Sequence, residues 1–487
     1  MISNYKQNYE LYNQSQLDKK TVTKILWLLS IALGCFGLLT PNPSETFFGC
    51  LVIPILFTLL WRPGEPPILM FAATFQFVQV FTPVIVANIA GQTLQDNTQT
   101  QSEINVALYV GIVAIIILAI GMRLGGKQSH RQVFAINNLN LENRLNPQRL
   151  ITAYIITFFV SNLLKGIAFV NPGFTQLLIA ISSFHWFIIY IILYSGMKHS
   201  RFRLIAFIII SIETILGFTG FFSSFKTIFF LLLVVYGGTS YKISKLLRPQ
   251  IMIIVVLILG LTTYWQGVKG EYRNYVNLGT QTQTVQVSLA DRLSFHTTAI
   301  TQINSEKIQI GLESGLKRLG YIGFLAASIK TVPENIPHQN GRLWLESLVH
   351  LYPRFLNPDK PVIEDSRRTN EFTGFKVAGA AQGTSISIGY VGESYIDFGI
   401  PLMFVPILLL GYLWGWLYRF LCKQGKNNHL LGIAAGTTLI LNLAILFESS
   451  NIKIVGAAIS STLVYLVFLR FSGDKVWQWL TKGNKVV

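Results

Sequence analysis

Charged side chains are scarce in this sequence. Of its 487 residues, 51% are hydrophobic and only 13% are Asp, Glu, Lys or Arg, whereas soluble proteins carry roughly 25% charged residues. A soluble domain is therefore excluded, and the composition predicts a polytopic membrane protein.

Cysteines and metal-binding motifs are also scarce. Cys35, Cys50 and Cys422 are widely spaced and lie in apolar runs, which offers neither a disulfide framework nor a metal cluster. The chain contains no D-x-D and no H-E-x-x-H motif. Asp397-Phe398-Gly399 spells DFG, but no glycine-rich loop or HRD motif accompanies it, so a kinase is excluded. We expect no metal and no cofactor.

Long apolar runs are abundant. Runs long enough to cross the roughly 30 Å hydrocarbon core lie near 24–40, 46–61, 67–90, 105–125, 150–170, 174–196, 203–221, 224–240, 250–266, 400–421, 429–447 and 453–471. We therefore expect an all-α fold with about twelve transmembrane helices. Residues 1–23 and 472–487 would be tails, 24–266 would hold helices one to nine, 267–399 a long connection, and 400–471 helices ten to twelve.

The basic residues predict the orientation. If the N-terminus is cytoplasmic, 23 of the 39 Lys and Arg residues lie in cytoplasmic segments, three in short outer loops or helix ends, and 13 in the connection 267–399. The positive-inside rule then places both termini in the cytoplasm and the long connection outside, as a periplasmic loop. That connection balances its 13 basic residues with 12 acidic ones. The net charge of +17 is thus mainly a cytoplasmic rim facing anionic headgroups, which argues against nucleic acid as a partner.

Two stretches of the long connection have helical patterns. Apolar residues recur at three- and four-residue intervals over 309–330, which predicts one amphipathic helix. Residues 342–352 predict a second apolar helix, ended by Pro353. Both are too short or too polar to span a membrane, so we expect them to be interfacial helices on the outer leaflet.

Arginines are dense on the predicted outer face. They are Arg273, Arg292, Arg318, Arg342, Arg354, Arg367 and Arg368. A guanidinium presents a planar fork of donors that matches phosphate oxygens two at a time. These residues favour a lipid diphosphate as ligand, with headgroup contacts and surface salt bridges as the simpler alternative. Arg354 and Lys360 stand out because prolines flank them in the segment PRFLNPDKP.

Glu393 and Asp397 lie four residues apart, on one face if this stretch is helical. Such a pair can serve as a general base and its orienting partner, or hold a cation. The alternative is a helix start at which the dipole favours acids. Gly399 and Pro401 interrupt the entry into the next helix, and broken helices often line sites in membrane proteins.

Two ionisable residues fall inside predicted membrane helices. Glu213 lies in the middle of the seventh run and His185 in the sixth. Intramembrane ionisable groups are functional candidates, so Glu213 is interpreted either as part of a relay or lipid channel, or as a local interhelical hydrogen-bond partner. His185 is interpreted as a satisfied interior histidine.

Two segments within 341–399 carry a resemblance to a known family. They are YPRFLNPDKP, with Pro353, Arg354, Pro358, Lys360 and Pro361, and GESYIDFG, with Gly392, Glu393, Tyr395, Phe398 and Gly399. With twelve spans and one long outer loop, they resemble the oligosaccharide repeat-unit polymerases (Wzy-type O-antigen or exopolysaccharide polymerases). In that family a PR-x-x-x-P-x-KP-like segment precedes a G-E-x-Y-x-x-FG segment. This chain departs from it at Asp397, where a neutral residue, often Asn, is expected.

The resemblance implies a metal-independent, inverting glycosyltransferase of the GT-C-like membrane type. It would move a growing glycan from one undecaprenyl diphosphate to the non-reducing sugar of another lipid-linked repeat unit, at the outer face of the bacterial inner (plasma) membrane. The implied partners are the undecaprenyl-diphosphate-linked oligosaccharide, the lipid bilayer, and chain-length regulator and flippase proteins.

The same interpretation assigns roles to the residues found above. The diphosphate would be bound by Arg354, Lys360, Arg318, Arg292 and Arg273, because positive charge stabilises the leaving group. Glu393 is the first choice as the base for the acceptor hydroxyl and His350 the second. Tyr395, Asp397 and Arg367 would position the substrate.

Three other functions fit the sequence. A glycan ligase would use the same lipid-linked donor with another acceptor. A flippase or other secondary transporter fits twelve spans, although transporters usually show repeat symmetry around a midplane site, and no internal repeat is evident here. A structural partner in an export complex is the third.

Overall fold

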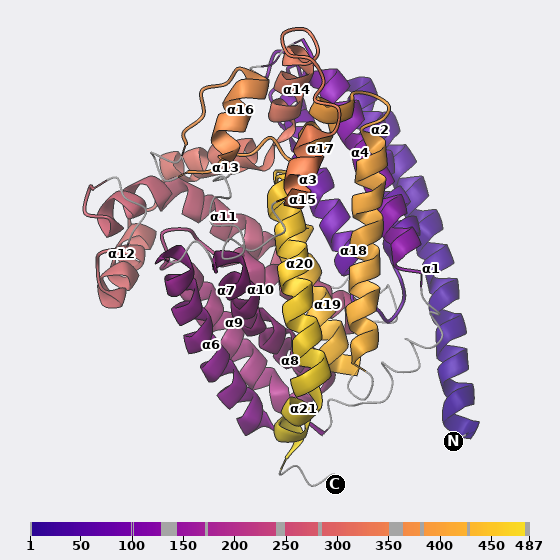
Figure 1. Ribbon diagram of the computed structural model, residues 1–487, viewed down its shortest axis with the longest axis vertical. Helices are drawn as coiled ribbons and strands as arrows, with labels where there is room; N and C mark the ends of the chain where they lie inside the picture. Colours follow the sequence, from indigo (N-terminus) through magenta and orange to yellow (C-terminus); the bar gives the residue numbers. More distant parts are fainter. Residues whose placement is uncertain are drawn as a thin grey trace.

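The computed structural model describes residues 2–98, 100, 102–127, 144–170, 174–239, 249–280, 285–349, 364–379, 384–425 and 429–482. These parts of the chain are built from helices, and no strand occurs among them (Figure 1). The expected all-helical, polytopic architecture is confirmed.

Nine helical segments in the described chain are long and apolar enough to cross a membrane. They comprise α1 (Ile2–Gly37), α2 (Pro43–Leu60), α3 (Ile68–Ile89), α4 (Ile104–Gly125), α6 (Pro147–Val170), α7 with α8 (Thr175–Ser182, Phe184–Lys198), α11 (Pro249–Val276), α18 (Phe404–Gln424), and α20 continuing into α21 (Asn451–Val467, Gly473–Thr481). The other three expected spans are the shorter helices α9 (Arg203–Gly217), α10 (Lys226–Thr239) and α19 (His429–Leu443). Nine of the twelve expected spans therefore have the length to cross a membrane.

Between α11 and α18, the described residues form six short helices, and we call them the cap helices. They are α12 (Leu289–Thr301), α13 (Ser305–Leu319), α14 (Ile322–Thr331), α15 (Arg342–Val349), α16 (Asp365–Thr373) and α17 (Tyr390–Phe398). Figure 1 shows α14, α16 and α17 at one end of the molecule, and the start of α1 together with α21 at the opposite end.

The expected single helix over 309–330 is wrong, because the chain breaks between α13 and α14. Gly320 has an extended backbone, with ψ of 117°, and the main-chain N–H of Tyr321 donates to the carbonyl of Gln79 in α3 over 2.9 Å. A Cβ on Gly320 would lie 2.8 Å from the ring of Pro83. The turn is thus docked against α3, which the helical periodicity alone does not reveal.

Glycines allow α4 and α18 to pack closely. Gly121 and Gly125 on α4 face Gly411 and Gly415 on α18, and a Cβ on any of the four would overlap a backbone atom of the other helix. Two small-x-x-x-small motifs therefore meet, an arrangement that lets the backbones of membrane helices approach each other.

Replacing Gly415 with Leu is expected to separate α4 from α18, because its Cβ would collide with the carbonyl of Met122. Overpacking of this kind costs about 1–3 kcal/mol, which a thermal-unfolding assay in detergent would detect. Gly260→Leu is the matched control, since no atom lies within 4 Å of a Cβ at that position. Equal effects of both substitutions would contradict this packing.

Two buried glutamines of α3 hold the connection between α19 and α20. Gln76 Nε2 donates to the carbonyl of Ala444 over 2.6 Å, and Gln76 Oε1 accepts from the hydroxyl of Tyr390 over 2.7 Å. Gln79 Oε1 accepts from the main-chain N–H of Phe447 over 2.8 Å. Residues 444–447 and α17 are therefore fixed to α3, beside the cap helices.

The intramembrane ionisable residues bond to one another. Glu213 Oε1 of α9 accepts from the hydroxyl of Tyr154 in α6 over 2.6 Å and lies 3.0 Å from Nε2 of His185 in α8. All three side chains are buried. These contacts match the interpretation of Glu213 as an interhelical hydrogen-bond partner. His185 is an interior histidine as expected, but only Nε2 is satisfied, because its buried Nδ1 has no hydrogen-bond partner among the described residues.

Candidate functional site

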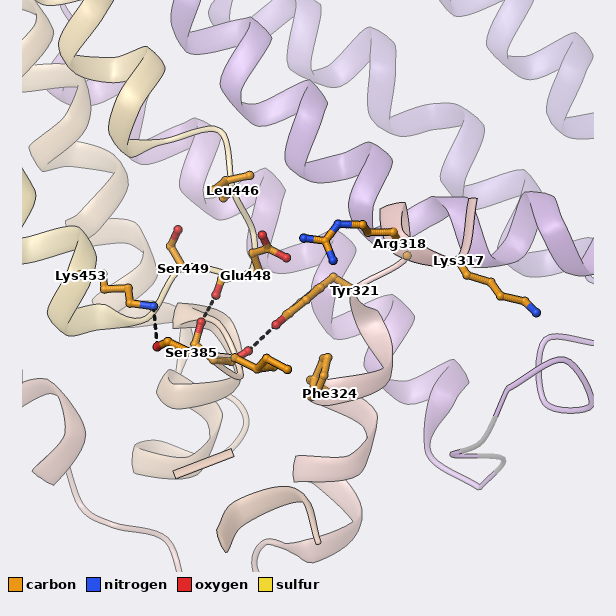
Figure 2. A pocket seen from close by; sticks show the side chains of 12 residues that line it. Lys317, Arg318, Tyr321, Phe324, Ser385, Leu446, Glu448, Ser449 and Lys453 are labelled. Atoms are coloured by element: carbon orange, nitrogen blue, oxygen red, sulfur yellow. Dashed lines mark hydrogen bonds between the residues drawn. The ribbon is translucent and has the colours of Figure 1, made fainter. Parts of the chain in front are cut away.

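A cavity of about 410 Å³ lies where the turn from α13 to α14 meets the connection between α19 and α20 (Figure 2). Its lining includes three basic residues, Lys317, Arg318 and Lys453. Tyr321, Ser385–Ser387 and Glu448 complete most of the polar wall. We call it the cationic cavity.

The walls of the cationic cavity are tied together by hydrogen bonds. Tyr321 donates from its hydroxyl to the carbonyl of Ser387 over 2.6 Å, and Ser387 Oγ donates to the carbonyl of Glu448. The next residues add a main-chain bond of 2.8 Å from the N–H of Tyr390 to the carbonyl of Ser449. The cavity is therefore built on a fixed backbone, as expected of a preformed binding site.

Basic residues from other helices gather behind the cavity. The charge of Arg318 acts on Lys226 at the start of α10 and on Lys269 and Arg273 of α11, and these groups repel one another. The carboxylate of Glu448 also acts on Lys226, so one acid faces several cations, and the excess of like charge is unfavourable. Their convergence makes this part of the structure suited to a polyanionic ligand.

Glu448 is the acid of the cavity wall. Figure 2 shows the guanidinium of Arg318 extending toward it. Burial raises the pKa of Glu448, and the charges of Arg318, Lys453 and Lys226 lower it. Burial also raises the pKa of Tyr321, so its phenol stays neutral and can donate a hydrogen bond.

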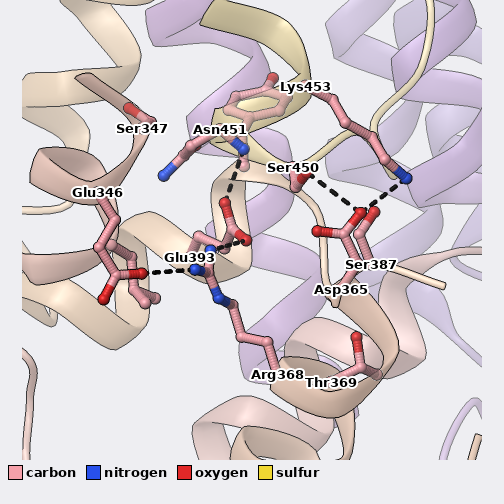
Figure 3. A network of polar contacts seen from close by, with 12 residues as sticks. Glu346, Ser347, Asp365, Arg368, Thr369, Ser387, Glu393, Ser450, Asn451 and Lys453 are labelled. Carbon is pink, nitrogen blue, oxygen red and sulfur yellow. Dashed lines mark hydrogen bonds and ion pairs between the residues drawn. The ribbon is translucent and has the colours of Figure 1, made fainter. Parts of the chain in front are cut away.

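An ion-pair network around the buried side chain of Glu393 lies beside the cavity (Figure 3). Arg368 of α16 donates from Nη1 to Glu393 Oε1 over 3.1 Å and from Nη2 to Glu346 Oε2 over 2.6 Å. The second carboxylate oxygen of Glu393 accepts from the main-chain N–H of Asn451 over 2.7 Å. The network thus joins α15, α16 and α17 to the start of α20.

Asp365 connects this network to the cationic cavity. Its side chain is fully buried, and Oδ2 lies 2.7 Å from Nζ of Lys453. The same oxygen accepts from Ser385 over 3.3 Å and from Ser450 over 3.4 Å. Lys453 is half-exposed and lines the cavity, so Asp365 holds a cation at its edge.

The predicted acid pair occurs on α17, but the structure gives its members separate partners. Asp397 accepts main-chain hydrogen bonds from Leu343 over 3.0 Å and from Trp344 over 2.9 Å, so it binds the first turn of α15. Burial raises the pKa of Asp397 and these two N–H groups lower it. Its geometry fits a helix-capping role.

Glu393 is the first predicted general base, but its surroundings fit a structural role better. The side chain is 1% exposed and both oxygens are engaged. It does not line the cationic cavity. Burial raises its pKa to about 7, while Arg368 and the N–H of Asn451 lower it.

The raised pKa of Glu393 predicts a pH-dependent stability. The folded protein binds this proton more tightly than the unfolded chain, so the contribution is complete below pH 4.5 and is lost as the pH rises through about 7. The free energy of unfolding should fall over this interval by about 3 kcal/mol. Thermal unfolding of Glu393→Gln at several pH values should lack this component. If Glu393→Gln showed the same dependence of stability on pH as the unmodified protein, the assignment of this pH dependence to Glu393 would be contradicted.

The remaining predicted residues lie in different surroundings. Arg318 lines the cationic cavity, and Arg273 lies behind it with its guanidinium over the rings of Phe221 and Phe222. Arg292 instead donates to the carbonyls of Thr219 and Ser288.

Two positioning candidates lie away from the cavity lining. Tyr395 is buried and donates to the carbonyl of Val332 over 2.8 Å. The side chain of Arg367 is 81% exposed and lies 3.8 Å from Glu364. His350, Arg354 and Lys360 lie outside the described residues, so their roles stay predictions.

The sequence places Arg368 only among the dense outer arginines, and it does not show that Arg368 pairs with Glu346 and Glu393 or that Lys453 pairs with Asp365. The choice between the neighbours Arg367 and Arg368 follows from the buried face of α16, on which Asp365, Thr369 and Phe372 recur at helical spacing. Arg368 lies three residues after Asp365 and four before Phe372, so this periodicity could have identified it.

The helices and the cationic cavity define a polytopic, all-helical membrane protein with a candidate anion-binding site among its cap helices. The chain belongs to the family described as "Domain of unknown function (DUF8712)", whose model matches residues 67–469. No curated protein and no solved structure matches the chain.

Proposed function

We propose that this protein polymerises oligosaccharide repeat units linked to undecaprenyl diphosphate at the outer face of the bacterial inner membrane. The observation that carries the proposal is the cationic cavity, with Arg318, Lys317 and Lys453 in its wall and further basic residues behind it. A diphosphate is the polyanion that a lipid-linked sugar presents at a membrane surface.

In this proposal the cationic cavity binds the donor. Arg318 offers a fork of N–H donors to the phosphate oxygens, and Lys453 adds a second cation whose position Asp365 fixes. Cleavage of the sugar–phosphate bond places negative charge on the leaving diphosphate, and fixed positive groups stabilise that charge. Tyr321 contributes a neutral wall bonded to Ser387.

The acceptor hydroxyl needs a base. Glu393 is engaged by Arg368 and Asn451, and His350, which lies outside the described residues, is the other predicted base. The segment containing Arg354 and Lys360 is proposed to add further phosphate contacts. The GT-C-like inverting mechanism and the outer position of the cap helices belong to the same proposal.

Purified lipid-linked repeat units test this function. The protein in liposomes, supplied with these units alone, should convert them to a ladder of longer lipid-linked glycans. A ligase would leave their length unchanged, and a flippase would move them across the bilayer without extension. Unextended units in the presence of a folded protein would contradict the polymerase proposal.

A further inference from the structure

A second cavity of about 550 Å³ lies on the other side of the turn between α13 and α14. Its wall comes from the turn between α13 and α14, the end of α3, the start of α4, residues 375–377, and Asn97, Thr98 and Thr100. It shares Lys317, Gly320 and Phe324 with the cationic cavity. The two cavities are therefore neighbours that meet at one turn.

The lining of the second cavity differs in chemistry from that of the first. Asn97 and Thr98 lie in its wall. Asn97 Nδ2 donates to Gln92 Oε1 over 2.7 Å and Thr98 Oγ1 to the carbonyl of Leu94 over 3.1 Å, so both side-chain oxygens and the second amide N–H of Asn97 remain for the hydroxyls of a ligand. Phe324 and Phe375 form an edge-to-face pair with ring centroids 5.7 Å apart. These groups match a ligand with many hydroxyls and apolar ring faces, which describes a saccharide.

The charge of the second cavity indicates which kind of saccharide it would bind. Lys317 and Lys376 line it, and none of the described residues in its wall is an Asp or Glu. Both lysines are exposed, so their ammonium groups are accessible to a ligand. A neutral sugar offers no anionic partner to these ammonium groups, whereas the carboxylate of an acidic sugar would pair with them.

We propose that the second cavity binds an acidic saccharide. The further assignment, that this saccharide is the glycan of the acceptor substrate, rests on the proposed polymerase function. Binding beside the cationic cavity would bring the acceptor sugar close to the donor diphosphate, since Lys317 and Phe324 border both spaces. The saccharide recognition itself depends only on the second cavity.

Three probes separate the two cavities in the purified full-length protein, held in a detergent without a sugar headgroup. Trigalacturonate is the acidic saccharide, maltotriose its neutral counterpart, and inorganic pyrophosphate the probe of the cationic cavity. The variants are Lys376→Gln for the second cavity and Arg318→Gln for the cationic cavity. Lys330→Gln is the control, because Lys330 is exposed and lines neither cavity.

Calorimetry should show that trigalacturonate binds about tenfold more tightly than maltotriose, as one charge-assisted hydrogen bond predicts. Lys376→Gln should abolish that preference, while Arg318→Gln and Lys330→Gln should preserve it. Equal binding of the two saccharides, or a preference that survives Lys376→Gln, would overturn the inference.

Pyrophosphate reports on the proposed function separately. Its binding should weaken in Arg318→Gln and persist in Lys376→Gln. If pyrophosphate binding were independent of Arg318 while trigalacturonate binding required Lys376, the assignment of the cationic cavity as the donor site would be contradicted. The assignment of the second cavity as a saccharide site would still be supported. Competition between pyrophosphate and trigalacturonate for one site would overturn the two-cavity assignment.

Discussion

Arg318→Gln is expected to lower the rate of glycan extension about 100-fold, the effect typical of removing one group that stabilises transition-state charge. The side chain lines the cationic cavity and is exposed, so its loss should leave the fold intact. Removing it relieves the repulsion with Lys226, Lys269 and Arg273 but also removes a cation that stabilises the carboxylate of Glu448. Because these two effects oppose each other, thermal stability should change little.

The measurement is the length of lipid-linked glycan formed in liposomes by equal amounts of folded protein. Arg367→Gln is the matched control, because this arginine is 81% exposed and lies against Glu364. It should extend glycans like the unmodified protein. Full activity of Arg318→Gln, or an equal loss of activity in Arg367→Gln, would contradict the proposal that the cationic cavity binds the donor diphosphate.

Arg368→Met is expected to have the largest effect on stability. It leaves Glu393 buried without its cation, and breaking a buried ion pair on one side typically costs about 3–5 kcal/mol. The substitution also removes the partner of Glu346. Since the network joins three cap helices to α20, its loss should loosen the region beside the cationic cavity.

The cost of Arg368→Met should depend on pH. The pKa of Glu393 is about 7 with Arg368 present, and Arg368 lowers it, so in the variant the carboxyl should hold its proton to higher pH. At pH 6 a neutral Glu393 carries a smaller penalty than an unpaired carboxylate at pH 8. Thermal unfolding should show a larger loss at pH 8.

A double variant separates charge from packing. Combining Arg368→Met with Glu393→Gln removes the unpaired charge, so it should recover a substantial part of the lost stability at pH 8. A double variant as unstable as Arg368→Met alone would show that Arg368 stabilises through packing. Arg367→Met is the control for a methionine at a neighbouring exposed position.

The membrane architecture could be predicted from the sequence because its signal is local. A run of apolar residues either has the length of a bilayer or does not, and all twelve expected runs coincide with helices. Nine reach the required length within the described chain. The predicted helix at 342–352 appears as α15 over Arg342–Val349, while 350–352 lie outside the described residues. The stretch with Glu393 and Asp397 is helical, as the pairing of these acids on one face required, and forms α17.

The failures concern contacts between distant residues. Periodicity continues through 309–330, but docking of Tyr321 on Gln79 ends the helix at Leu319. The partners of Glu393 lie on α16 and at the start of α20. Spacing along the chain could place that acid on a helix, but it could not show that Arg368 neutralises it.

The candidate site was predicted only in part for the same reason. Of the predicted phosphate-binding arginines, Arg318 lines the cavity, but arginine density did not distinguish exposed arginines from buried ones. Lys453 comes from α20, more than a hundred residues away in the sequence, and its place depends on Asp365 and on the glutamines that fix the preceding connection.

A structure of the protein with bound undecaprenyl diphosphate would test the central claim most directly. The account predicts density for the diphosphate in the cationic cavity, with phosphate oxygens about 3 Å from the guanidinium of Arg318 and the ammonium of Lys453. Diphosphate density at another place, with the cationic cavity empty at saturating ligand, would contradict it.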